Sequence, residues 1–242
     1  MAGWIHCIEP VQINPGTNTL VIFVNGFTES PSPGATQAKP DPAGFGKASA
    51  MLEKITGVQV ATFSSARGDL TQKDIAASIE NLKAANPNAK VVLVGHSQGA
   101  DNIVELAKSD KNIQIDLAIL VDSKDGSNGF FFNLDDDNIG TNVKNVINYR
   151  QETEMMLQGE EIDPSDIEDN TKTKLADKVV KGAIHTSMDG NVAYQVVQDV
   201  CNLLLGKQPV DEANKREIHA QKPAKGDRTA FQILKQKYLK SK

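Results

Sequence analysis

Short, continuously apolar segments alternate with helical patterns along this chain, and this alternation constrains the fold more than any other feature. The two clearest segments, residues 20–24 (LVIFV) and 91–94 (VVLV), are rich in β-branched residues and lead into glycine-containing turns. Continuous apolarity is typical of strands that are covered on both faces, as in a parallel sheet. Further strands are predicted at residues 58–63, 117–121 and 143–149, with an additional edge strand at residues 4–8.

Helical periodicity fills the intervals between these segments. Ile75, Ile79 and Leu82 recur at helical spacing, and Pro87 follows the end of that pattern. Similar patterns predict helices over residues 45–55, 74–85, 99–108 and 192–205. Because strands and helices alternate, we expect right-handed βαβ units. The fold class is therefore predicted to be α/β, a three-layer sandwich with a mostly parallel sheet of about 5–7 strands flanked by helices.

The chain is long enough to form one domain with its own core. A chain of 242 residues buries roughly 70–75% of its unfolded surface, so it needs no disulfide or metal to hold it together. We expect this domain to span residues 1–206, with insertions near 29–42, 122–140 and 152–182. Residues 207–242 are expected to form a basic tail.

Charge is unevenly distributed along the sequence. Residues 211–242 hold nine Lys and Arg against four Asp and Glu, whereas the rest of the chain holds 17 against 27. The overall net charge of −5 argues against nucleic acid as the main partner. We expect a solvated tail, with transient contact to a membrane surface as the alternative. Apolar residues between Phe231 and Tyr238 favour a helix near its end.

Cysteine usage and hydropathy indicate the compartment. Cys7 and Cys201 are the only cysteines, which excludes a disulfide framework and gives no metal-binding spacing. No apolar run approaches the ~18–20 residues of a membrane span, and residues 1–10 lack the pattern of a signal peptide. We expect a cytoplasmic protein without a transmembrane segment. Export by a route that needs no cleaved signal is compatible with the same sequence, and the oligomeric state is left open.

One turn carries the chemistry. Residues 95–99, GHSQG, fit the pattern G-x-S-x-G and join the apolar strand at 90–94 to a predicted helix. Such a strand–turn–helix setting is typical of a nucleophile elbow, in which a strained turn exposes the serine hydroxyl. Side chains at positions 95 and 99 would collide with the neighbouring strand and helix. The helix N-terminus adds positive partial charge where an oxyanion would develop. Ser97 is therefore the predicted nucleophile.

This turn and the order of elements around it resemble the α/β-hydrolase superfamily, especially its lipases, cutinases and thioesterases. The resemblance covers roughly residues 20–205. It implies an α/β-hydrolase-like sandwich, the catalytic order Ser, then Asp or Glu, then His, and an oxyanion hole. One donor to that hole would be the backbone N–H of Gln98. The other would be the N–H of Phe27, which follows Asn25-Gly26 where such enzymes often carry His-Gly.

Two histidines downstream of Ser97 could supply the base that this order requires. In the superfamily this histidine lies on a loop before the last helix, and His185 lies just before the helix predicted at 192–205. His219 lies in the polar tail and fits less well. His96, inside the elbow, is expected to point elsewhere and to have a structural role.

The acid has two main candidates. It should be shielded at a strand end, where it can orient the imidazole. Asp122 follows the strand predicted at 117–121, a position used by some lipases and by polyketide-type thioesterases. Glu152 follows the next strand, as in cutinases, and Glu154 is a further option. We prefer Asp122 because an apolar strand directly precedes it.

These features predict a serine hydrolase that cleaves a carboxylic ester through a Ser97 acyl-enzyme, without a cofactor. The expected substrate is a small-molecule or lipid ester, so the protein would be a lipase or esterase, with a phospholipase as a narrower form. Alternatives are a thioesterase or amidase, and a catalytically silent binding protein on a hydrolase scaffold. Phe130–Phe132 would either line an acyl pocket or anchor an insertion. Residues 135–137 (DDD) lack EF-hand spacing, so no metal site is expected.

Overall fold

All the strands in the described part of the chain belong to one parallel sheet. The computed structural model describes residues 9–26, 44–123, 138–154, 157–210 and 218–219. Within them the strand order is β2-β1-β3-β4-β5-β6-β7, and every neighbouring pair is parallel. The strands are β1 (Thr19–Asn25), β2 (Val58–Ser64), β3 (Lys90–His96), β4 (Leu117–Val121), β5 (Asn145–Arg150), β6 (Lys174–Lys181) and β7 (Ile218–His219).

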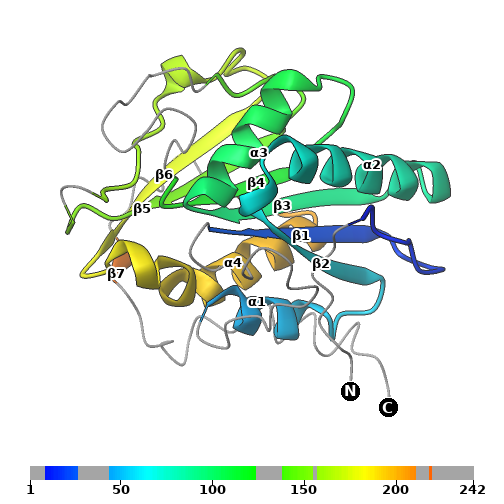
Figure 1. The fold of residues 1–242 in the computed structure, drawn as a ribbon, viewed down its shortest axis with the longest axis horizontal. Coiled ribbons are helices and arrows are strands. Elements are labelled where there is room, and N and C mark those ends of the chain that lie inside the picture. Colours follow the sequence, from blue (N-terminus) through cyan, green and yellow to red (C-terminus); the bar gives the residue numbers. More distant parts are fainter. Residues whose placement is uncertain (1–8, 27–43, 124–137, 155–156, 211–217, 220–242) are drawn as a thin grey trace.

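Helices cover both faces of this sheet, which confirms the predicted α/β sandwich. Helices α2 (Asp69–Ala85) and α3 (Gln98–Ser109) lie on one face, and α1 (Phe45–Leu52) and α4 (Met188–Leu204) lie on the other (Figure 1). Helices α2 and α4 begin earlier than residues 74 and 192, where the apolar periodicity starts. No helix in the described ranges is long and apolar enough to cross a membrane.

The buried core forms two layers, one on each side of the sheet. In β1, Val21 and Phe23 pack with α1 and α4, whereas the alternating residues Leu20 and Ile22 pack with α2 and α3. Every residue of β1 is buried. Two-sided coverage explains why the strand sequence is continuously apolar, because successive side chains of a strand point to opposite faces.

Strands β6 and β7 lie where the sequence analysis placed an insertion and a tail. Half of the residues of β6, KLADKVVK, are charged, and only Ala176 and Val180 are buried. It was missed because a strand near the edge of a sheet needs little apolar surface. β7 pairs with β6 through Ile218 and His219, so these two residues of the segment 207–242 belong to the sheet.

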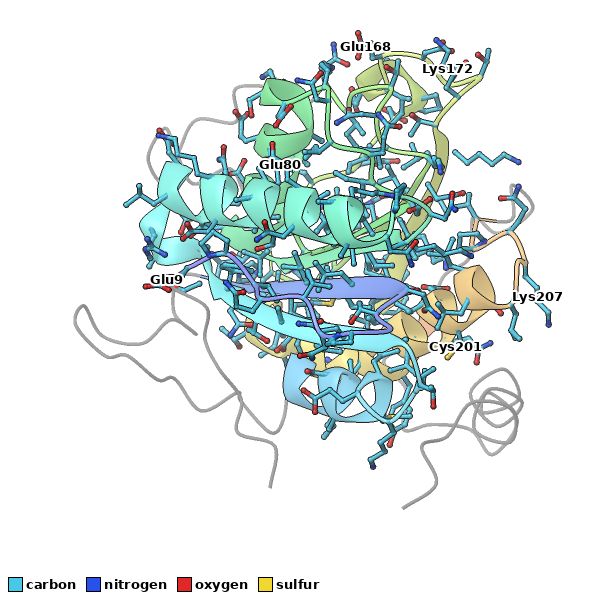
Figure 2. All side chains as sticks on the ribbon, turned by 90° about the vertical axis from the view of Figure 1, so that its right-hand side faces the viewer. Glu9, Glu80, Glu168, Lys172, Cys201 and Lys207 are labelled. Carbon is cyan, nitrogen blue, oxygen red and sulfur yellow. The ribbon has the colours of Figure 1, made fainter. Side chains whose placement is uncertain are left out.

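Several charged side chains lie on the outside of the sandwich, whereas others, such as Asp122, Arg150 and Asp199, are buried. Figure 2 shows Glu80 on the outer side of α2, Glu168 and Lys172 together at one end of the molecule, and Lys207 beyond α4.

Several sequence predictions fall outside the described residues. These are the edge strand at 4–8, the insertion at 29–42, Phe130–Phe132, the acidic run at 135–137 and the helix near the end of the tail.

Candidate active site

Ser97 occupies a strained turn between β3 and α3. Its backbone has φ 53° and ψ −127°, a combination that residues with a side chain rarely adopt. In the described ranges, the only non-glycine residues with positive φ are Ser97 and Asp122, whose φ is 49°. Conformations of this kind persist only where the surrounding structure enforces them, and they cluster at functional sites.

The two glycines of the elbow are required by close packing, as predicted. A Cβ atom at Gly95 would overlap the carbonyl oxygen of Gly99 in α3. A Cβ atom at Gly99 would overlap the carbonyl oxygen of Val24 in β1. The turn therefore brings the start of α3 directly against the neighbouring strand, which fixes the position of Ser97.

Three predicted residues, separated by many positions in the sequence, form one hydrogen-bonded chain. Nε2 of His185 lies 2.9 Å from Oγ of Ser97. Nδ1 of the same ring lies 2.7 Å from Oδ2 of Asp122. The structure thus brings together the predicted nucleophile, the preferred base and the preferred acid.

The topology of the sheet places these residues at its carboxyl edge. Ser97 directly follows β3, and its N–H donates to the carbonyl of Val121 in β4 at 2.9 Å. Asp122 directly follows β4, and its N–H donates to the carbonyl of Tyr149 in β5 at 2.6 Å. His185 lies after β6, in the turn that leads into α4. The carboxyl edge of an open α/β sheet is where ligand sites usually form.

Asp122 is completely sealed from solvent. Its exposed fraction is 0%, and Oδ1 accepts a hydrogen bond from the backbone N–H of Gln151 at 2.9 Å. The backbone of Gly159 packs so closely that a Cβ atom there would overlap Oδ1. A buried carboxylate is costly unless hydrogen bonds compensate for lost water. Here both oxygens have a partner, one of which is the imidazole of His185.

Glu152, the alternative acid, lies in a different environment. Its carboxylate is 3.0 Å from Nζ of Lys181 and 2.9 Å from the guanidinium of Arg150. The hydrogen bond from Lys181, followed by that from Arg150, holds the pKa of Glu152 below its usual range. Glu154, the third option, accepts a hydrogen bond from the backbone N–H of His185 at 2.7 Å. It therefore contacts His185, but through the main chain.

His96 lies against His185, in contrast to the expectation that it points elsewhere. Its Nε2 is 3.0 Å from the carbonyl oxygen of His185, and the two ring centroids are 5.1 Å apart. Successive side chains at a strand end point to opposite faces, and α4 covers the face opposite α3. Sequence reasoning missed this contact because it depends on which face carries α4. Of the other histidines, His219 lies in β7, where it pairs with Lys181.

The predicted oxyanion donors are only partly described. Gln98 is the first residue of α3, so its backbone N–H is one of those that lack an acceptor within the helix. Among the described residues, no acceptor outside the helix takes this N–H. Gly26 lies at the end of β1, and a Cβ atom there would be 3.2 Å from Cβ of Ser97. Phe27 lies outside the described residues.

Comparisons with known proteins add little to this geometry. No family model matches the sequence, and a search of curated proteins gives no match. Among solved structures, the chain is similar to a cutinase-like protein from Cryptococcus sp., at 20% identity and a TM-score of 0.36. The match covers 51% of this chain and 60% of that protein, which is less than two thirds of its length. A likeness this weak does not assign a function to the chain.

Proposed function

We propose that the protein is a serine hydrolase of the α/β-hydrolase type, which cleaves carboxylic esters through an acyl-enzyme on Ser97. The observation that carries this proposal is the chain of hydrogen bonds from Ser97 Oγ through His185 to Asp122, at 2.9 and 2.7 Å. A serine within reach of an imidazole that is itself oriented by a buried carboxylate is an activated nucleophile. The positive φ of Ser97 and the glycine packing around it support the same assignment.

In the proposed acylation step, Ser97 Oγ attacks the carbonyl carbon of the ester. Its proton passes to Nε2 of His185, and the negative charge of Asp122 stabilises the imidazolium that forms. The tetrahedral intermediate then collapses, the bond to the alcohol breaks, and His185 returns the proton to the departing oxygen. Asp122 stays ionised throughout and holds the imidazole in the tautomer with its proton on Nδ1.

Deacylation repeats the same proton transfers with water as the nucleophile. His185 takes a proton from water, the hydroxide attacks the acyl carbon, and Oγ of Ser97 leaves with the proton from His185. The products are a carboxylic acid and the free enzyme, so the reaction balances without any added oxidant or metal. Both steps pass through an oxyanion.

The backbone N–H groups of Gln98 and Phe27 are the proposed donors to this oxyanion. The N–H of Gln98 is at the N-terminus of α3, where helix geometry also supplies positive partial charge. Phe27 follows Gly26, whose backbone lies against Ser97. Removing one such donor in a comparable enzyme lowers kcat by roughly 10²–10³-fold.

The test is hydrolysis of chromogenic esters that range from acetate to long acyl chains, with a thioester and an anilide of the same acids beside them. Wild-type protein should hydrolyse esters best, and the chain-length profile then separates an esterase from a lipase. Ser97→Ala should lower kcat on the order of a million-fold, as in a comparable triad. His185→Ala should have an effect of similar size.

Matched controls use the same residue types elsewhere. Ser109→Ala, at the far end of α3, and His219→Ala, in β7, should retain wild-type activity. Less than a tenfold loss in folded Ser97→Ala would overturn the proposal. Wild-type protein that cleaves none of the three substrate types would instead favour a catalytically silent scaffold.

A further inference from the structure

The main chain of His185 is held by side chains from two other parts of the fold. Its N–H donates to the carboxylate of Glu154, in the connection between β5 and β6, at 2.7 Å. Its carbonyl oxygen lies 3.0 Å from Nε2 of His96, at the end of β3. His185 itself begins a short turn of residues 185–187 and belongs to no strand. These two contacts therefore fix the peptide groups on both sides of His185.

The contact from His96 requires one tautomer. A carbonyl oxygen only accepts hydrogen bonds, so His96 must carry a proton on Nε2 in order to donate to it. His96 is 2% exposed, and its ring contacts two other rings. The Phe45 ring is edge-on, with centroids 6.4 Å apart, and the ring of His185 has its centroid 5.1 Å away. Packing of this kind leaves His96 little freedom to reorient.

His96 is also the residue directly before Ser97. The proposed nucleophile and the side chain that holds the carbonyl of His185 are thus consecutive residues, one just after the end of β3 and one at its buried end. Any movement of the elbow carries both of them together. This arrangement would keep the separation of Ser97 Oγ and His185 Nε2 constant.

We propose that His96 is a positioning residue that sets the location of the His185 imidazole relative to Ser97. Its Nε2–H anchors the carbonyl of His185, and its ring supports the imidazole from the side. This inference rests on the proposed hydrolase function. A misplacement of about 1 Å in a catalytic group can cost on the order of 10²-fold in rate, so loss of the anchor lowers kcat and leaves substrate binding largely intact.

Two substitutions distinguish a role for the hydrogen bond from His96 to the carbonyl of His185 from a role in which the ring only fills space. His96→Phe keeps an aromatic ring of similar shape and removes the N–H donor. His96→Gln loses the ring but carries an amide N–H at about the distance of Nε2 along the side chain. His219→Phe in β7 is the matched control. Should His96→Phe fail to fold, His96→Met fills the same space flexibly without a donor.

The measurements are kcat and KM on the preferred ester, the melting temperature, and the NMR signal of the proton between His185 Nδ1 and Asp122. His96→Phe is expected to lower kcat by about 10–100-fold with KM within about twofold, and to broaden or abolish that signal. His96→Gln is expected to recover most of the lost kcat and to restore the signal. Recovery by Gln is not expected if His96 merely fills space.

Three results would overturn the inference. These are a kcat for the Phe variant within twofold of wild type, a rise in KM at unchanged kcat, or equal losses in the Phe and Gln variants at equal stability. Failure of the underlying hydrolase proposal gives a different pattern. In that case wild-type protein cleaves no ester, whereas failure of the His96 inference leaves wild-type activity and its dependence on Ser97 intact.

Discussion

The ends of β4 and β5 each present a carboxylate at the same edge of the sheet, yet the two lie in opposite environments. Asp122, after β4, is 0% exposed, and Glu152, after β5, has a side chain that is 39% exposed. In the described part of the chain, His185 is the one titratable side chain bonded to Asp122. Glu152 instead pairs with two cations, Arg150 and Lys181.

This difference shows what makes a strand-end carboxylate suitable as the acid. The charge of Glu152 is already neutralised by its cationic partners and screened by water. The charge of Asp122 acts on the imidazole through one short hydrogen bond in a fully buried position, where electrostatic interactions are stronger. Both carboxylates follow a parallel strand, so position alone does not distinguish them, and burial beneath the segment around Gly159 favours Asp122 as the acid of the proposed mechanism.

Among changes at or around the two carboxylates, the largest effect is expected from Asp122→Asn. This change keeps the shape of the side chain but removes the charge that holds the imidazole tautomer. A comparable substitution in the serine-protease template lowers kcat by roughly 10⁴-fold, and we expect a similar loss here at little change in KM. Steady-state kinetics on one ester provides the measurement. A loss below tenfold would remove Asp122 from the proposed mechanism.

An intermediate effect is expected from Gly159→Ala, which disturbs the close packing of Gly159 that buries Asp122. The added Cβ would overlap Oδ1 of Asp122, so the carboxylate or the loop must shift. A displacement on the order of 1 Å predicts a loss of about 10–100-fold in kcat. If kcat stays at the wild-type value, the packing of Gly159 does not position Asp122.

Gly206→Ala is the control for this experiment. Gly206 has φ +70° and no atom near its would-be Cβ, and it follows α4 away from the site. Forcing a side chain into this conformation costs about 1–2 kcal/mol of stability. We expect a lower melting temperature with unchanged kcat, which separates loss of stability from displacement of Asp122.

The smallest effect is expected from Glu152→Gln. Its carboxylate pairs with Arg150 and Lys181 and not with His185, so kcat should stay within about twofold of wild type. Its lowered pKa means that the ionised form is favoured in the folded state. Its stabilising contribution is therefore present above the unfolded pKa and is lost as pH falls through the folded pKa. Since the group is partly exposed, this contribution should stay below about 1 kcal/mol.

Urea unfolding of wild type and Glu152→Gln at neutral and acidic pH checks the sign. The difference between their midpoints should be small at neutral pH and should shrink further as the pH falls. A difference that grows toward acid pH would contradict the assigned direction. A loss of kcat as large as that of Asp122→Asn would reverse the comparison of the two carboxylates.

Local sequence patterns predict the elbow well, because its determinants are consecutive residues. Ser97 and the two flanking glycines could be assigned from five positions, since the close packing they allow is a property of any strand–turn–helix of this kind. His185 required only chain order and the helix that follows it. The geometry brings both residues together as the sequence analysis expected.

Features that depend on distant segments could not be assigned in this way. The sequence favoured Asp122 over Glu152 only by position. The residue that buries Asp122, Gly159, lies in a segment that was interpreted as an insertion. The contact of His96 with His185 depends on the face that α4 covers. β6 (Lys174–Lys181) was missed because charged residues interrupt its apolar ones, as suits a partly covered strand near the sheet edge.

The most direct test of the central claim is covalent labelling with a fluorophosphonate, followed by intact mass measurement and peptide mapping. The probe reacts with a serine only if a nearby base activates it. The proposed mechanism predicts one adduct on Ser97 in wild-type protein, none in Ser97→Ala, and strongly slowed labelling in His185→Ala. Labelling of a different serine, or equal labelling of wild type and folded Ser97→Ala, would contradict it.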